Sequence, residues 1–165
     1  MGAGIAVKAV MLDKFSLVTY GCAQIVMDMQ PLVVMLTNRG DIHGWTHTFV
    51  AALGLGALAA LIGKYLTPWL LHLLTFGRHA RMVVPWRVAI LSALVGTLSH
   101  VLLDAFVYPG VKPFWPFTRA NPLDFGITMN GMINFCIISG GIGLVVYLIR
   151  WVVKKSRKSD SHAVK

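Results

Sequence analysis

Four stretches of this chain are long and apolar enough to cross a lipid bilayer, and this constrains the fold more than any motif does. The hydrocarbon core of a bilayer is about 30 Å thick, a distance that about 20 residues of α-helix can span. The expected spans cover residues 15–36, 43–66, 84–107 and 127–151. We therefore predict an all-α fold, an integral membrane bundle of four transmembrane helices.

The composition agrees with a membrane protein. Only 13% of the residues are charged and 56% are hydrophobic, whereas soluble domains carry about 25% charged residues. The net charge of +9 does not lead us to expect nucleic-acid binding, because the basic residues flank the apolar runs. Cys22 and Cys136 lie inside apolar stretches without a CxxC motif, which excludes a disulfide framework.

The distribution of Lys and Arg predicts the orientation. Short cytoplasmic loops carry an excess of positive charge. With four spans, both termini and residues 67–83 share one side, and that side holds 12 of the 15 Lys and Arg residues. Arg39, Lys112 and Arg119 fall on the other side. We expect cytoplasmic termini, one transmembrane domain over residues 1–155, and a basic, disordered cytoplasmic tail over residues 156–165. Residues 108–126 would form an irregular outer segment.

Each span carries two polar residues four positions apart, and such residues share one face of a helix. The pairs are Gln24 with Asp28, His43 with His47, His100 with Asp104, and Asn130 with Asn134. At a rise of about 1.5 Å per residue, all eight lie in the outer half of the membrane. An ionisable residue in a span costs about 2.5–3.5 kcal/mol at its centre and usually has partners in the bundle. We predict one shared polar cluster.

Imidazole and carboxylate together suit a divalent metal. Two His residues on one helix can both be ligands, and an Asp one turn from a His can be a ligand or can fix the imidazole tautomer. Zinc is the first choice, with manganese and iron as alternatives. A bound metal makes hydroxide available near pH 7, so hydrolysis is the simplest reaction. Asp104 as a helix cap, and Asn130 and Asn134 as interhelical hydrogen-bonding residues, remain open alternatives.

Three motifs resemble a known family. "HGWTHTF" at 43–49, "GTLSHVLLDAFVYPGVKPFWPF" at 96–117 and "NPL" at 121–123 are similar to elements of small bacterial and archaeal inner-membrane hydrolases. These are described as metal-dependent and as LexA-binding, membrane-associated hydrolases. "MDMQP" at 27–31 resembles their acidic element. The resemblance covers residues 1 to about 126 and implies an inner (plasma) membrane protein. The implied metal-site residues are Asp28, His43, His47, His100 and Asp104.

Two departures from the family pattern bear on the ligand set. Gln30 stands where the acidic element often has a second carboxylate, and Met1 stands where an N-terminal HxGxGxxxK element has its His. A start upstream of Met1 would restore that ligand. We expect Asp28 to be a ligand or the general base. The expected substrate is a phosphoester or lipid headgroup, with Lys112 and Arg119 as its anion contacts or as simple interfacial anchors.

Two alternatives belong to other functional classes. The cluster could hold a structural metal or line a path for ions or protons, in which case the protein would not be an enzyme. Alternatively, residues 67–83 or the basic tail could bind a soluble repressor. A metal site with an open position favours catalysis, a closed four-ligand site favours structure, and a polar path through the inner half would favour transport.

Overall fold

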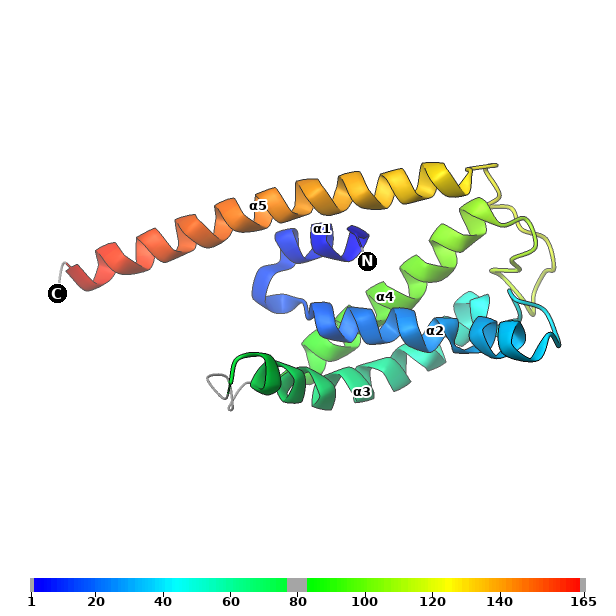
Figure 1. The fold of residues 1–165 in the computed structure, drawn as a ribbon, viewed down its shortest axis with the longest axis horizontal. Coiled ribbons are helices and arrows are strands. Elements are labelled where there is room, and N and C mark those ends of the chain that lie inside the picture. Colours follow the sequence, from blue (N-terminus) through cyan, green and yellow to red (C-terminus); the bar gives the residue numbers. More distant parts are fainter. Residues whose placement is uncertain (1, 77–82, 164–165) are drawn as a thin grey trace.

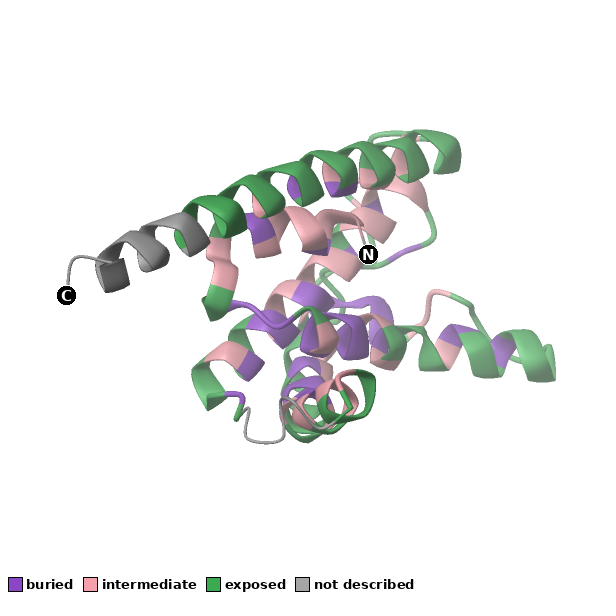
Figure 2. Ribbon diagram, turned by 60° about the vertical axis from the view of Figure 1, so that its left-hand side comes forward, coloured by how far each residue is buried: buried purple, intermediate pink, exposed green. Residues whose placement is uncertain are grey.

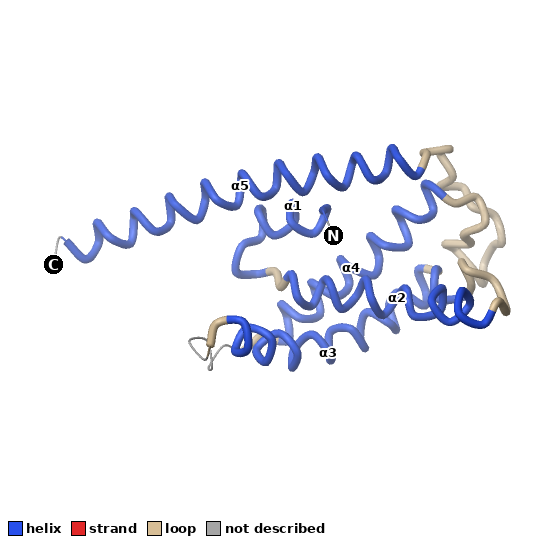
Figure 3. The backbone as a smooth tube through the Cα atoms, viewed as in Figure 1, coloured by secondary structure: helices blue, strands red, loops and turns tan. Residues whose placement is uncertain are grey.

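The computed structural model describes residues 2–76 and 83–163, with side chains up to residue 154, and this part of the chain contains helices and no strand. Four helices are long and apolar enough to span a membrane, as predicted: α2 (Leu17–Thr37), α3 (Phe49–Leu74), α4 (Trp86–Val107) and α5 (Met129–Ala163). A shorter helix, α1 (Gly2–Met11), precedes them (Figures 1 and 3). The all-α, four-span fold class is confirmed.

Helices α2, α3 and α4 pack against one another through small side chains. Their shared core contains Ala23, Ala59 and Ala93, each with 0% of its surface exposed. A Cβ added at Gly96 on α4 would lie 2.6 Å from the Cβ of Ala23 on α2. Small residues let helix backbones approach closely in membranes, where packing rather than water exclusion drives association. Buried residues are accordingly concentrated in these three helices (Figure 2).

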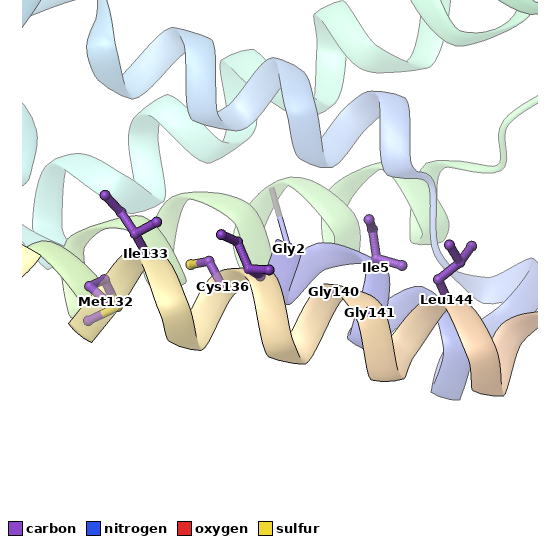
Figure 4. Close-up of a pocket in the computed structure, with 9 residues that line it drawn as sticks. Gly2, Ile5, Met132, Ile133, Cys136, Gly140, Gly141 and Leu144 are labelled. Atoms are coloured by element: carbon purple, nitrogen blue, oxygen red, sulfur yellow. The ribbon is translucent and has the colours of Figure 1, made fainter. Parts of the chain in front are cut away.

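Helix α5 is held to the protein mainly through α1, a helix that the sequence analysis did not predict. The two helices lie side by side, and α1 occupies the space between α5 and the three-helix core (Figures 1 and 2). Arg150 Nη1 donates to the carbonyl oxygens of Ala9 and Val10 at 2.8 and 2.9 Å. An apolar pocket of about 490 Å³ lies where Gly2 and Ile5 face α5 (Figure 4).

The second span begins six residues later than predicted. Thr48 has an extended backbone (φ −119°, ψ 151°), and its hydroxyl accepts a hydrogen bond from Ala51 N, so it caps α3. Trp45–His47 form a separate 3-10 turn, η2. The prediction that His43 and His47 share one helix face is therefore wrong, because an N-cap residue with extended backbone separates them from the helix.

Two other predicted segments differ from the structure. Helix α3 continues to Leu74, so the expected cytoplasmic loop starts later than residue 67, and its Arg78, His79 and Arg81 lie outside the described residues. Asn130 and Asn134 on α5 are exposed and do not join the other polar pairs. The backbone of α5 stays helical to Ala163, and the division of the chain at residue 155 stays a prediction.

The irregular segment 108–126 folds over the start of α3 and the end of α4. The carbonyl oxygen of Pro113 accepts from Phe49 N at 2.8 Å, at the first residue of α3. Asn121 Nδ2 donates to the carbonyl oxygens of Ala105 and Tyr108 at 2.9 and 3.1 Å, at the end of α4. The segment thus satisfies backbone groups that helix ends leave open.

Two neighbouring glycines of α5 test whether α1 holds this helix. A Cβ at Gly143 would lie 2.6 Å from the backbone of Ala6, whereas a Cβ at Gly141 meets no atom within 4 Å. Gly143→Ala should lower the free energy of unfolding by about 1–3 kcal/mol through overpacking. Gly141→Ala should be neutral or stabilising by up to about 1 kcal/mol, from helix propensity alone. Thermal unfolding in detergent micelles measures both, and equal midpoints would contradict the α1–α5 contact.

Candidate metal centre

Four of the five predicted site residues meet at the end of the three-helix core where α3 begins and α4 ends. Asp28 comes from α2, His47 from the turn η2, and His100 and Asp104 from α4. His100 Nε2 lies 3.2 Å from Asp28 Oδ1 and 3.3 Å from Asp104 Oδ2, and His47 Nε2 lies 3.3 Å from the same Asp104 oxygen. The ligand atoms of Asp28, His47 and His100 all lie within 4.8 Å of one another.

A hydrogen-bond chain fixes the tautomer of His100. Gln24 Nε2 donates to the carbonyl oxygen of Gly96 at 2.9 Å, and a carbonyl oxygen can only accept. The other amide atom of this side chain, Oε1, therefore faces His100 Nδ1 at 3.1 Å, and it must accept the Nδ1 proton. In the neutral ring the lone pair is then on Nε2, the atom that points at both carboxylates.

A second chain does the same for His47. Gln30 Nε2 donates to the carbonyl oxygen of Asp41 at 3.0 Å, so Gln30 Oε1 accepts the single hydroxyl proton of Thr46 at 2.5 Å. The Thr46 oxygen must then accept from His47 Nδ1, which lies 3.0 Å away. His47 is 1% exposed, and in its neutral ring the lone pair is likewise on Nε2, which faces Asp104. Hydrogen bonds of this kind orient the imidazole ligands of metal sites.

The donor set fits a divalent cation. In their neutral rings His47 turns a lone pair toward Asp104, and His100 turns one toward both Asp28 and Asp104, so a positive charge must lie between these groups, either ring protons or a bound cation. Ligand atoms about 2.0–2.1 Å from a tetrahedral metal lie roughly 3.3–3.4 Å apart, close to the 3.2–3.3 Å N···O separations found here. Two carboxylate charges would balance one divalent ion. The residues present therefore fit zinc, with manganese or iron as alternatives.

The cluster is open on one side. The side chains of His47 and His100 are 1% and 10% exposed, that of Asp104 is 25% exposed, and that of Asp28 is 59% exposed. Below it, Met27, Ala52 and Val101 form a fully buried apolar layer. The site is thus most accessible at Asp28, and its floor is apolar.

His43 lies beside the cluster, outside the group of converging atoms. Its ring is 5.4 Å from the ring of His47 and 4.3 Å from that of Tyr108, measured between centroids. Burial lowers the pKa of His43, which favours the neutral imidazole near pH 7. Its role as a metal ligand stays a prediction, and the structure places it one ring away from the other four residues.

Two residues of the site, Thr46 and Gln30, were not predicted from the sequence. Gln30 had stood out only as a departure from a carboxylate pattern, yet it connects Thr46 to a backbone carbonyl. A signal was present in the sequence, because a polar amide inside a membrane span needs a partner. Gln24 is a second amide inside a span, and its partners are the carbonyl oxygen of Gly96 and the ring of His100.

The fold and the cluster together define a class of protein, the multi-pass α-helical membrane proteins with a cluster of His and Asp residues near one membrane face. The family model described as "YdjM inner membrane protein" matches residues 11–161. The chain belongs to this family and is a multi-pass inner-membrane protein. Comparison with curated proteins and comparison with solved structures each gave no match.

The hydrogen-bond chain to His47 can be tested with a matched pair of variants. Thr46→Val keeps the shape of the side chain but removes the hydroxyl that accepts from His47 Nδ1, whereas Thr46→Ser keeps the hydroxyl. The Val variant should bind Zn²⁺ about 10–100-fold more weakly than wild type, as expected for the loss of a ligand-orienting hydrogen bond. The Ser variant should stay close to wild type. Titration against a competing chelator measures the affinities, and equal affinities for Val and Ser would contradict the role of the hydroxyl.

Proposed function

We propose that this protein is a membrane-embedded metal-dependent hydrolase that acts on a phosphoester, such as a lipid headgroup. The observation that carries the proposal is the pair of Nε2 atoms of His47 and His100. Hydrogen-bond chains fix the tautomers of both rings. His47 Nε2 faces Asp104 and His100 Nε2 faces both Asp104 and Asp28, in a site that is open on one side. These hydrogen bonds orient the two imidazole rings before any ion is bound.

His47, His100 and Asp104 would hold the ion, with Asp28 as a fourth ligand or as the general base. A divalent metal bound there supplies Lewis acidity and a nucleophilic water near neutral pH. Asp28 suits the role of base because one carboxylate oxygen faces His100 and the side chain is 59% exposed. Its other oxygen can accept a proton from water. The apolar floor of Met27, Ala52 and Val101 strengthens each charge interaction by lowering the local dielectric constant.

The outer segment 108–126 supports a substrate at headgroup depth. Trp115 and Phe117 are exposed there, and aromatic side chains favour the membrane–water interface. Lys112 and Arg119 supply positive charge on the same segment and are both exposed. With cytoplasmic termini, as the distribution of Lys and Arg favours, the cluster would face the outer side of the membrane.

Two observations weigh against the non-catalytic alternatives. A structural zinc site is closed by its protein ligands, whereas the exposure of Asp28 leaves this cluster accessible. A path for ions would need polar groups below the cluster. In the described core that region contains Ala23, Ala59 and Ala93. The buried hydroxyl group of Thr97 donates to the carbonyl oxygen of Leu94, and those of Ser16, Thr19, Thr67 and Ser92 hydrogen-bond among themselves and to nearby backbone.

The decisive experiment begins with the metal content of the detergent-purified protein by elemental mass spectrometry. Wild type should carry about one zinc or manganese ion per chain, and a His47→Ala, His100→Ala double variant should carry none. His72→Ala is the matched control, because His72 is exposed near the far end of α3. Metal-loaded wild type should hydrolyse a phosphodiester or a phospholipid, and Asp28→Asn should lose this activity while keeping its fold. Absence of metal after incubation with Zn²⁺ and Mn²⁺ would contradict the proposal.

The orientation can be tested by cysteine labelling in a background in which Cys22 and Cys136 are replaced by Ser. Ala120 and Val83 are exposed and precede α5 and α4, respectively. A membrane-impermeant maleimide should label Ala120→Cys in spheroplasts and label Val83→Cys only after the membrane is opened. Labelling of Val83→Cys in intact spheroplasts would reverse the proposed topology.

A further inference from the structure

A second polar site lies beside the metal centre, in a small cavity of about 130 Å³ on the outer side of the cluster. Two segments form it: the turn before α3 and the start of the outer segment 108–126. Its walls include the side chains of Asp41, His43, Trp45, Thr48, Lys112 and Trp115. None of these residues belongs to the group of atoms that converge on the metal centre.

The cavity presents opposite charges that do not neutralise each other. Asp41 contributes a carboxylate and Lys112 an ammonium group, and no ion pair or side-chain hydrogen bond joins either group to another described residue. A purely anionic ligand would meet the carboxylate, and a purely cationic one would meet the ammonium group. A ligand with an amine at one end and a phosphate at the other would satisfy both groups.

The tryptophans favour an amine near the carboxylate. Trp45 and Trp115 both line the cavity, and the face of an indole ring attracts a cation within about 6 Å of its centroid. The cavity volume matches a small polar group. Since one water molecule takes about 30 Å³ of liquid, a volume of about 130 Å³ corresponds to about four waters. This is the scale of a phosphate with a short amine.

The position of His43 connects this cavity to the metal centre. Its ring lines the cavity and also lies 5.4 Å from the ring of His47. A phosphate bound in this cavity would thus lie next to His43, whose ring neighbours that of His47. If the phosphate belonged to a phospholipid, the glycerol that it esterifies would carry the acyl chains into the bilayer.

We propose that this small cavity binds a zwitterionic group that carries both an amine and a phosphate, as phosphoethanolamine does. Its amine would lie at Asp41 and its phosphate at Lys112. The inference deepens the proposed function, on which it rests, by naming the headgroup class of the substrate. The group can come from a phospholipid headgroup or from the free water-soluble compound. His43 then serves as a wall of the substrate site.

Binding can be measured without any catalytic readout. The protein in detergent is titrated with phosphoethanolamine, inorganic phosphate, ethanolamine and glycerol phosphate, and the change in tryptophan fluorescence is followed. Phosphoethanolamine should bind more tightly than the three other compounds. Lys112→Met and Asp41→Asn should each weaken this binding about tenfold, as expected for the loss of one hydrogen bond to a charged group. Arg119→Met is the matched control, because Arg119 is an exposed cation of the same segment that does not line the cavity, and it should change binding little.

A second arm separates the lipid from the free compound. The protein is placed in nanodiscs containing equal amounts of phosphatidylethanolamine and phosphatidylglycerol, and the lipid retained after extraction is identified by native mass spectrometry. Selective retention of phosphatidylethanolamine, lost in Asp41→Asn, assigns the site to the lipid. Binding of phosphoethanolamine alone assigns it to the free compound. Equal retention of both lipids together with no preference for phosphoethanolamine overturns the proposal.

The test also distinguishes failure of this inference from failure of the proposed function. The His47→Ala, His100→Ala variant removes the metal ligands but leaves Asp41, Lys112 and the two tryptophans in place. It should therefore still bind phosphoethanolamine. Loss of binding by both wild type and this variant overturns the cavity proposal whatever the metal content. If wild type takes up no metal after incubation with Zn²⁺ and Mn²⁺ but still binds phosphoethanolamine, the cavity proposal is supported and the hydrolase is overturned.

Discussion

Polar atoms inside a lipid bilayer must find partners within the protein, and the site of this protein is organised by that requirement. Two amides, Gln24 and Gln30, each place their NH₂ group on a backbone carbonyl and thereby direct their oxygen toward a His ring, directly or through Thr46. Each chain of hydrogen bonds ends on a backbone carbonyl oxygen, which can only accept. This determines which atom donates and which accepts in every other hydrogen bond of the chain. The imidazole lone pairs then have one orientation, toward Asp28 and Asp104.

This arrangement depends on close helix packing a turn or two away. Gly96 lets α4 approach Ala23 of α2, and its own carbonyl oxygen is the acceptor that orients Gln24. A larger side chain at residue 96 would move the carbonyl that sets the His100 tautomer. The small residues of the core therefore affect the site through a backbone position as well as through packing.

The sequence predicted the features that depend on length, hydropathy and periodicity. Four spans follow from the apolar runs, and the shared depth of Asp28, His100 and Asp104 indicated their convergence. The placement of His43 and His47 on a helix failed because Thr48 caps α3, a local hydrogen bond that competes with the helical pattern. The expected contribution of Asn130 and Asn134 failed because periodicity shows which residues share a face but not which helix that face meets. The role of Thr46 could not be predicted, since it requires Gln30 of another segment to lie within hydrogen-bonding distance.

The attachment of α5 through α1 has a consequence for the order in which the protein can assemble. Arg150 bonds to the end of α1 across a separation of 141 residues, so α1 is synthesised well before α5, its main partner. At about 5–20 residues per second, α1 waits roughly 7–30 s before that partner is made. During this interval the three-helix core, with its His and Asp residues, can form first. A nascent chain arrested before α5 would then hold the metal-site residues in place while α1 still lacked the helix against which it packs.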